Sequence, residues 1–489
     1  MIRFLEEAEK IIRINSVSNT GNEEVAIYLQ TLLNQEGFKT ILQEVLHSLE
    51  SISKRQFNII GFLGDTLVDS TTSKGLLLNT HIDTVGPGIR AHWTETSGDP
   101  FCASIREDRI YGLGTADVKL DFLCKLKACE RYRNRKLKMP IYLVGTAAEE
   151  IGMLGAKFLI KSRILNPKYC IVGEPSNLAV IHAHKAYTIY QISIGFSELE
   201  KDARGYNTRI EVHCTGKSAH SGYPHIGDNA IHKMLSVIQK IRAAHFQLKL
   251  SKVYGGDSIN KVPDQAGIEF YLSSASFDDF KKFYGEHLND EAIQVEFGGL
   301  GESGMRFMPD NVLDSIEEIK QCFDKLQNTF LSEKDESFNP SSSTINFGKI
   351  QYSLRNIDMF FDIRLLPQIA PDEFDHKLKE IVQALNARFP NLVLKVLRQR
   401  FNPALDIKQD HELVVAACES QQAIGMSSQL DKKSTSTEAA QYFGAGFPAI
   451  VFGPGQSMGN SHSPNEHNLV EHLDKAVHFY DRMIERFCI

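Results

Sequence analysis

The sequence predicts an α/β protein whose catalytic domain is a doubly wound, mostly parallel sheet, interrupted by an inserted α+β lid domain. Apolar, strand-like runs alternate with helical patterns over the first part of the chain, long alternating strands dominate the middle, and the first pattern resumes near Phe401. Apolar strands that alternate with helices are typical of a parallel sheet covered on both faces. We expect the catalytic domain to comprise residues 1–185 and 398–489, and the lid residues 186–397.

Helical spacing and short apolar runs follow one another through the first part of the catalytic domain. The second helix closes at Gly37, as helices often do at glycine. Ligand sites in sheets of this kind lie at the carboxyl ends of the strands. We expect helices at 2–14, 23–36, 117–132 and 153–163, and strands at 57–63, 75–81, 139–146 and 169–173.

The middle of the chain alternates Ile, Thr, Tyr and Val with polar residues, which predicts antiparallel strands. The series of elements then recurs after the polar segment 333–343, so we interpret the lid as two related halves, although no close sequence repeat accompanies them. The predicted helices are 228–245, 276–287, 312–330 and 371–387, and the predicted strands fall within 186–215 and at 249–255, 266–274, 293–297, 343–352, 356–365 and 391–397. In the second part of the catalytic domain we expect a helix at 411–424, a strand at 448–453 and a last helix from about 473.

Composition excludes several classes of function. A chain of 489 residues is too long for one core, and its net charge of −7 gives no basic footprint for nucleic acid. No apolar run approaches the ~20 residues of a membrane span, and acidic residues interrupt the N-terminal segment where a secretory signal would be apolar. The eight cysteines contain no Cys-x-x-Cys pair. We therefore expect a cytoplasmic protein with reduced thiols, and with neither a nucleic acid nor a membrane as partner.

Histidine and carboxylate side chains follow several of the predicted strands. His81 and Asp83 end the strand at 75–81, and Glu149, Glu150 and Glu174 follow the next two strands. Imidazole and carboxylate ligands together suit zinc, and three carboxylates with one bridging hydroxide would balance the charge of two zinc ions. Because neighbouring side chains of an extended segment point opposite ways, Glu150 can bind metal while Glu149 acts as a general base.

Residues 109–119 closely resemble the Gly-x-Gly-x-x-Asp-x-Lys signature of the dimetal amidohydrolases, the family of acetylornithine deacetylase, succinyl-diaminopimelate desuccinylase, aminoacylase, carboxypeptidase G and related dipeptidases. Further segments match this family in the same order along nearly the whole chain. They are His81 with Asp83, Trp93 with Pro100 and Phe101, Glu149 with Glu150 and Gly152, Gly173 with Glu174 and Pro175, Gly216 to His220, Asn260 to Pro263, Asp362 with Arg364, and Gly453 to Gly455 with His462 and Glu466.

The resemblance implies a role for each matching residue. His81 and Glu174 would hold one zinc ion, Glu150 and His462 the other, and Asp117 would bridge them, with cobalt or manganese able to substitute. Asp83 would orient His81, and Glu149 would move the proton between water and the leaving amine. His220 of the lid would stabilise the oxyanion, and Arg364 and Asn260 would bind a substrate carboxylate. The family also implies a cis peptide between Asp117 and Val118.

The resemblance implies a hydrolase of an N-acyl amino acid or of a short peptide with a free carboxylate. Glu at position 174 favours the deacylases and carboxypeptidases of the family, whereas the long lid favours a dipeptidase as the alternative. A non-catalytic binding module is a third reading, which the complete ligand set disfavours. The chain departs from the family pattern at Thr437–Ala439 and at His184–Ala186, and a lid of this length fits either a monomer or a homodimer. His213 is interpreted as a structural or solvent-facing histidine.

Overall fold

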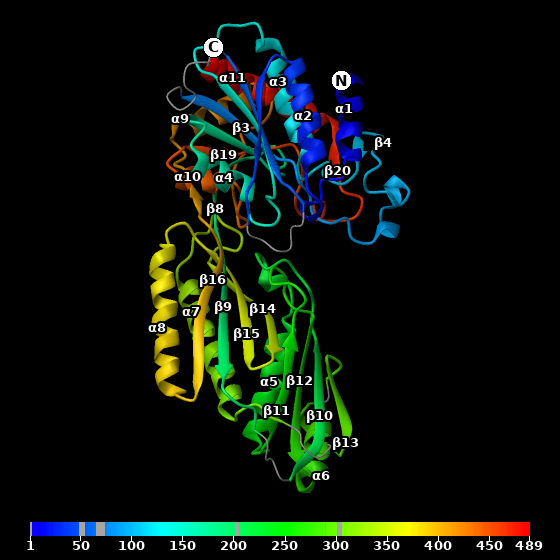
Figure 1. Cartoon of the computed structure of the whole chain (residues 1–489), viewed down its shortest axis with the longest axis vertical. Coiled ribbons are helices and arrows are strands. Elements are labelled where there is room, and N and C mark those ends of the chain that lie inside the picture. The colour runs from blue at the N-terminus through cyan, green and yellow to red at the C-terminus, as the bar shows by residue number, and fades with distance from the viewer. Residues whose placement is uncertain (1, 48–53, 65–73, 201–204, 289, 301–305) are drawn as a thin grey trace. The chain divides into compact units, whose positions relative to one another are not determined.

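A nine-stranded sheet forms the centre of the first unit, residues 1–184 and 402–489, in the computed structural model of the chain (Figure 1). Its strands lie in the order β1-β2-β6-β3-β7-β19-β8-β17, and β18 pairs with β8. The central strands β6, β3, β7 and β19 are parallel neighbours, while β1, β2 and β17 pair antiparallel at the edges. The predicted, mostly parallel sheet is thus confirmed at its centre.

The expected elements of this unit are present in order, together with further strands and a helix at Ala439–Gly444 that were not predicted. The strands of the large sheet are β1 (Lys39–Glu44), β2 (Phe57–Leu63), β3 (Gly75–His81), β6 (Ile141–Thr146), β7 (Pro167–Gly173), β8 (Val180–His184), β17 (Leu405–Asp406), β18 (Leu430–Lys433) and β19 (Ala449–Val451). A small sheet contains β4 (Ser104–Arg106), β5 (Arg109–Tyr111) and β20 (His467–Leu469). The helices are α1 (Ile2–Arg13), α2 (Glu23–Gln35), α3 (Lys119–Cys129), α4 (Leu154–Ser162), α9 (Glu412–Ala423), α10 (Ala439–Gly444) and α11 (Val470–Cys488).

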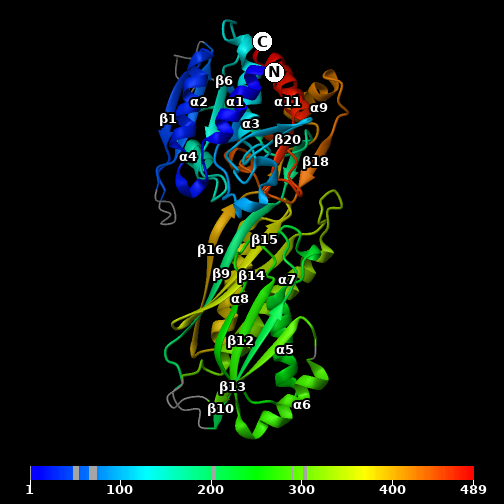
Figure 2. The same ribbon diagram turned by 90° about the vertical axis from the view of Figure 1, so that its right-hand side faces the viewer.

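Both faces of the large sheet are covered, because its central strands are apolar on both sides. Leu76 and Leu78 of β3 pack into a core with α1, α2, α3, α9 and α11, whereas Leu77 between them packs with α4 and α10. Figure 2 shows α1, α3 and α11 next to one another. This double cover leaves the carboxyl ends of β3, β6 and β7 as the place where polar side chains gather.

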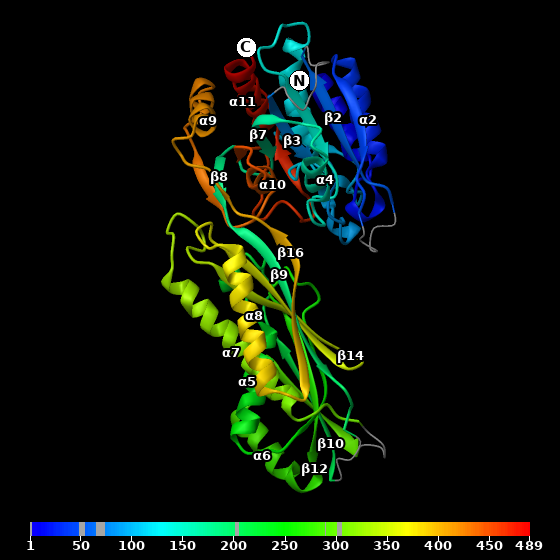
Figure 3. The ribbon, with the colours of Figure 1, turned by 60° about the vertical axis from the view of Figure 1, so that its left-hand side comes forward.

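The second unit, residues 185–401, contains one eight-stranded antiparallel sheet with α5, α7 and α8 on one side of it (Figure 3). The strands are β9 (Ala186–Phe196), β10 (Tyr206–Thr215), β11 (Lys249–Gly255), β12 (Gln265–Ser273), β13 (Ile293–Leu300), β14 (Thr344–Ser353), β15 (Asn356–Leu365) and β16 (Leu392–Asn402). The helices are α5 (Ala230–Ala243), α6 (Phe277–His287), α7 (Asn311–Ser332) and α8 (Pro371–Arg388).

The two halves of this unit repeat one topology. β10-α5-β11-β12-α6-β13 forms a four-stranded block in the order β13-β10-β12-β11, and β9-α7-β14-β15-α8-β16 forms the same block in the order β16-β9-β15-β14. The second strands of the two blocks, β11 and β14, pair antiparallel and join them into one sheet. The first block is thus inserted after the first strand of the second, which explains why the recurrence in the sequence is not a simple tandem repeat.

The structure describes residues 2–47, 54–64, 74–200, 205–288, 290–300 and 306–489. The second boundary between the units falls at 401/402, four residues beyond the expected 397/398, because β16 is longer than expected and ends only at Asn402. Among the described helices, none combines the length and apolar character that crossing a bilayer requires.

Candidate metal centre

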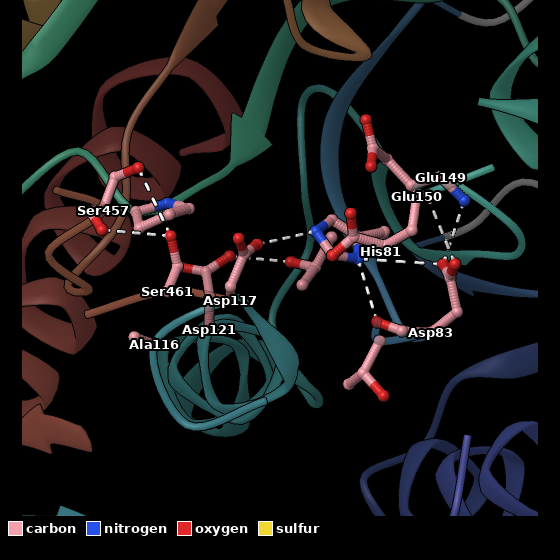
Figure 4. Close-up of polar contacts among 12 residues, drawn as sticks. His81, Asp83, Ala116, Asp117, Asp121, Glu149, Glu150, Ser457 and Ser461 are labelled. Atoms are coloured by element: carbon pink, nitrogen blue, oxygen red, sulfur yellow. Dashed lines mark hydrogen bonds and ion pairs between the residues drawn. The ribbon is translucent and has the colours of Figure 1, made fainter. Parts of the chain in front are cut away.

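Three neighbouring parallel strands bring the predicted ligands together. His81 is the last residue of β3, Glu149 and Glu150 follow β6, and Glu174 follows β7. Because β6, β3 and β7 lie side by side and run parallel, their carboxyl ends meet at one edge. Figure 4 shows His81, Asp117, Glu149 and Glu150 around a common space.

Asp117 lies between the two predicted histidine ligands. Its Oδ1 is 3.1 Å from Nε2 of His81, and its Oδ2 is 3.3 Å from Nε2 of His462. Nε2 of His462 is also 3.1 Å from Oε1 of Glu150. One carboxylate that faces an imidazole with each oxygen is the arrangement expected of a bridging ligand.

The tautomer of His81 indicates what this arrangement can hold. Nδ1 of His81 faces the backbone carbonyl of Asp83 at 3.1 Å, so Nδ1 carries the proton that it donates there. Nε2 then presents a lone pair to the Asp117 carboxylate, and two acceptors in contact require a cation or a second proton between them. The donor atoms of His81, Asp117 and Glu150 all lie within 4.8 Å of one another. These nitrogen and oxygen donors fit divalent ions of the zinc type.

The carboxylates of the site raise the pKa values of their neighbours, which indicates that the site favours the binding of cations. The Glu150 charge, together with that of Asp117, raises the pKa of His462 to about 12. Burial raises the pKa of Glu174 to about 8, and the Asp117 charge adds to this effect. Burial also raises the pKa of Glu149 well above its ordinary value, with the Glu174 charge as the next cause. The buried carboxylates thus repel one another until cations neutralise them.

A metal titration tests this electrostatic reading. We expect chelator-stripped protein to release protons when it binds zinc near pH 7, because zinc must displace protons from Glu174 and His462. The same competition makes binding tighter as the pH rises from about 6 to about 8. Calorimetry in two buffers with different ionisation enthalpies measures the released protons. Equal heats in both buffers would contradict this account.

Asp83 acts differently from the expected orienter. Its carboxylate is 3.7 Å from Nδ1 of His81, and it is the Asp83 carbonyl that accepts from the ring. The carboxylate instead accepts from the backbone N–H groups of Glu149 at 3.0 Å and Glu150 at 3.3 Å, and from Oγ of Ser18 at 2.6 Å. Asp83 therefore fixes the main chain of Glu149 and Glu150 together through its carboxylate, and it fixes His81 through its own backbone carbonyl.

The Asp117 loop is held by Glu466 and by close backbone packing. Oε1 of Glu466 accepts from the N–H groups of Ala116 at 2.8 Å and Asp117 at 3.0 Å, and the peptide between Asp117 and Val118 is cis, as the resemblance implied. A Cβ at Gly455 would lie 2.3 Å from the carbonyl oxygen of Ala116. Likewise, a Cβ at Gly453 would lie 2.3 Å from that of Glu174. Because Gly453 and Gly455 lack a Cβ, the loop that contains them can pack directly against the backbone of Ala116 and of Glu174.

Adding one methyl group to that loop tests its packing. We expect Gly455→Ala to lower the free energy of unfolding by about 1–3 kcal/mol and to weaken metal binding, because the Asp117 loop must shift. Urea unfolding and metal titration measure the two effects. Gly86→Ala is the matched control, since a Cβ there meets nothing within 4 Å. Equal stability of the two variants would be inconsistent with this role of Gly455.

One buried residue near the site has no role implied by the resemblance. Glu438, part of the departure at Thr437–Ala439, is completely buried, and its Oε2 accepts from Asn79 of β3 at 2.7 Å and Thr146 of β6 at 2.6 Å. It therefore ties together the ends of the two strands that carry His81 and lead to Glu149. Its position at the start of α10, against β3 and β6, rather than a motif, reveals this contact.

The remaining predicted residues belong to the second unit. His220 is exposed, and its Nδ1 accepts from the N–H of Gly222 at 3.0 Å. Asn260 is also exposed, and its side-chain oxygen accepts from Ser258. Arg364 is buried, donates through Nε and Nη2 to both oxygens of Asp362, and lies 3.6 Å over the ring of Tyr187. The substrate-binding roles of Arg364 and Asn260 stay predictions. In that role, the Arg364 guanidinium would have to bind the substrate carboxylate while it also donates to Asp362.

Comparisons with known proteins agree with this centre. The description of peptidase family M20/M25/M40 matches residues 77–486. The chain is 25% identical to an acetylornithine deacetylase from Proteus mirabilis over an alignment of 493 positions that covers 99% of this chain and 97% of the relative. In fold it is similar to the aminoacylhistidine dipeptidase of Vibrio alginolyticus, with a TM-score of 0.65, 16% identity and coverage of 99% and 96% of the two chains. It is also similar to an M20 family metallo-carboxypeptidase of Sulfolobus solfataricus, with a TM-score of 0.60, 17% identity and coverage of 100% and 99%.

The family match spans most of the chain and includes every predicted metal ligand. Successive contacts join four of these predicted ligands, from His81 to Asp117, from Asp117 to His462 and from His462 to Glu150, and Glu174 follows β7 at the same edge of the sheet. The chain therefore belongs to peptidase family M20/M25/M40 and is a metal-dependent amidohydrolase or peptidase.

Proposed function

We propose that the protein hydrolyses the amide bond of an N-acyl amino acid, or of a small peptide with a free carboxylate, with two zinc ions as cofactors. The observation that carries this proposal is the pair Glu149–Glu150. Asp83 accepts from both backbone N–H groups, while only Glu150 contacts His462. Glu149 is thereby left as a buried carboxylate with a raised pKa beside the ligands, as a general base requires.

His81 and Glu174 would hold one ion, Glu150 and His462 the other, and Asp117 would bridge them. When bound, such ions polarise a substrate carbonyl and make a water molecule more acidic. Glu149 takes a proton from the attacking water as the oxygen–carbon bond forms. It returns the proton to the amine nitrogen as the carbon–nitrogen bond breaks, so acid and base roles alternate on one carboxylate. We assign His220 to stabilise the oxyanion formed between these steps.

The deacylase reading has two supports. The relatives matched over 99% of this chain are named acetylornithine deacetylases, and the residue at position 174 is Glu, as in the deacylases and carboxypeptidases of the family. A panel of N-acetylated amino acids, N-acetylornithine among them, tests the proposal directly. Release of acetate at rates well above those for free dipeptides is the expected result.

A dipeptidase is the second candidate, and the duplicated second unit favours it. Solved structures of similar fold include the aminoacylhistidine dipeptidase and a human carnosine dipeptidase. The same panel separates the candidates, because a dipeptidase needs the free amino group that acetylation removes. Activity confined to the free dipeptides would replace the deacylase assignment by this one.

A further inference from the structure

A second group of metal-ligating side chains lies in the second unit, on its eight-stranded sheet. Glu211 and His213 are two residues apart on β10, so both side chains point to the same face. Glu296 of β13 is paired in register with Glu211, which places it beside them. We call these three residues the β10–β13 triad. The alternate residues Ile210, Val212 and Cys214 point into the core, so the triad lies on the opposite face.

The two carboxylates of the triad lie near the same ring nitrogen of His213. Nε2 of His213 is 3.4 Å from Oε1 of Glu211 and 4.0 Å from Oε1 of Glu296. The ligand atoms of all three residues lie within 4.8 Å of one another. The spacing leaves these atoms close enough to share one ion and too far apart to be fully satisfied by direct hydrogen bonds.

The other ring nitrogen is held in place. The hydroxyl of Tyr254 on β11 is 3.0 Å from Nδ1 of His213. The Tyr254 ring reaches across β12 at Gly267, where a Cβ would lie only 2.4 Å from the ring. A histidine ligand usually has its second nitrogen fixed by a hydrogen bond, which sets the tautomer that exposes the first. Tyr254 and Gly267 provide that arrangement here.

Carboxylates exceed cations around the triad. Arg209 contacts Glu211 through Nη2 and Glu269 through Nε, and Ser251 donates to the other oxygen of Glu269. Two carboxylates, those of Glu211 and Glu269, therefore share the Arg209 guanidinium, and the Lys252 ammonium lies 4.9 Å from the Tyr254 ring centre. Oε1 of Glu211 and Oε1 of Glu296 lie near Nε2 of His213, and the Glu211 carboxylate also accepts from the Tyr254 hydroxyl. The local charge favours a cation at this point.

We propose that Glu211, His213 and Glu296 bind a third divalent cation of the zinc type, separate from the metal centre of the first unit. One imidazole and two carboxylates are a ligand set that zinc accepts, with water completing the coordination. Because β13 is the edge strand of the sheet and β10 is its neighbour, the ion cross-links this edge. The site therefore stabilises the second unit and takes no part in hydrolysis.

Equilibrium dialysis of the full-length enzyme against micromolar zinc, followed by metal analysis, tests the proposal. We expect three ions per chain in the unaltered enzyme and two in His213→Ala and in Glu296→Gln, both with hydrolytic activity retained. Glu296 is exposed, so its variant keeps the fold. His287→Ala is the matched control, since His287 lies in the same unit beside a single carboxylate, and it should keep three ions.

The readout is a difference between variants, so it does not depend on the proposed reaction. Loss of the metals of the first unit would lower every count equally and leave the difference of one ion. Equal numbers of ions in the unaltered enzyme and in His213→Ala would overturn the proposal.

Discussion

Replacing Glu149 by glutamine lowers kcat by about 10²- to 10⁴-fold, the range that one general acid–base group supplies. Glutamine keeps the size of the side chain and the backbone N–H that donates to Asp83, but it cannot accept a proton. Metal content should be unchanged, because Glu149 contacts neither imidazole. Steady-state rates on the best substrate of the panel, together with metal analysis of the same sample, measure both quantities.

Glu150→Gln is the matched control for this prediction. The chemical change is identical and one residue away, yet Glu150 contacts His462, so this variant should lose metal as well as activity. The two neighbouring substitutions thus separate proton transfer from metal binding. An active Glu149→Gln enzyme, or one that has lost its metals, would disprove the division of roles.

Replacing Asp83 by alanine has the second large effect, on stability and metal affinity together. The Asp83 carboxylate is completely buried and accepts hydrogen bonds from three donors. The substitution would leave these three donors without their acceptor. We expect the free energy of unfolding to fall by about 3 kcal/mol and zinc to bind about 10- to 100-fold more weakly. The metal centre is loosened but not emptied, because His81 still donates to a backbone carbonyl.

Two further variants control for this effect. Ser18→Ala removes one donor to Asp83 and should cost about 1 kcal/mol, with both ions retained. His81→Ala removes a ligand and should leave one ion in the metal centre of the first unit. Urea unfolding and zinc titration across the three variants give the comparison. An Asp83→Ala protein as stable as Ser18→Ala would contradict the central position given to Asp83.

The strand-end ligands could be predicted from the sequence because periodicity and position carry their signal. A continuous apolar run such as 75–81 marks a strand buried on both faces, and the residue that ends it must lie at the edge where ligands bind. His81, Glu150 and Glu174 follow from this reasoning alone. The resemblance supplied what periodicity does not, namely Asp117 as the bridge and the pairing of His462 with Glu150.

Contacts between distant segments could not be predicted in this way. Ser18 donates to Asp83 across 65 residues, and only the folded chain brings them together. The ion pair of Arg364 with Asp362, two residues before it on β15, is different, because alternation along a strand places such a pair on one face and could have predicted it. The role of Arg364 toward substrate stays a prediction.

The β10–β13 triad shows the same limit more clearly. Taken singly, His213 reads as a structural or solvent-facing histidine, and Glu296 lies 83 positions later in another strand. Their proximity depends on the register of two strands joined by a helix, a hairpin and a second helix. A shift of one residue in that register would turn the Glu296 side chain to the opposite face.

Anomalous diffraction from zinc-soaked crystals, collected on both sides of the zinc absorption edge, tests the central claim most directly. The predicted result is two zinc peaks at the carboxyl ends of β3, β6 and β7, one beside His81 and Glu174 and one beside Glu150 and His462, with Asp117 between them. A single peak, or two peaks that do not share Asp117, would contradict the assignment of this edge of the sheet as a dimetal hydrolase centre.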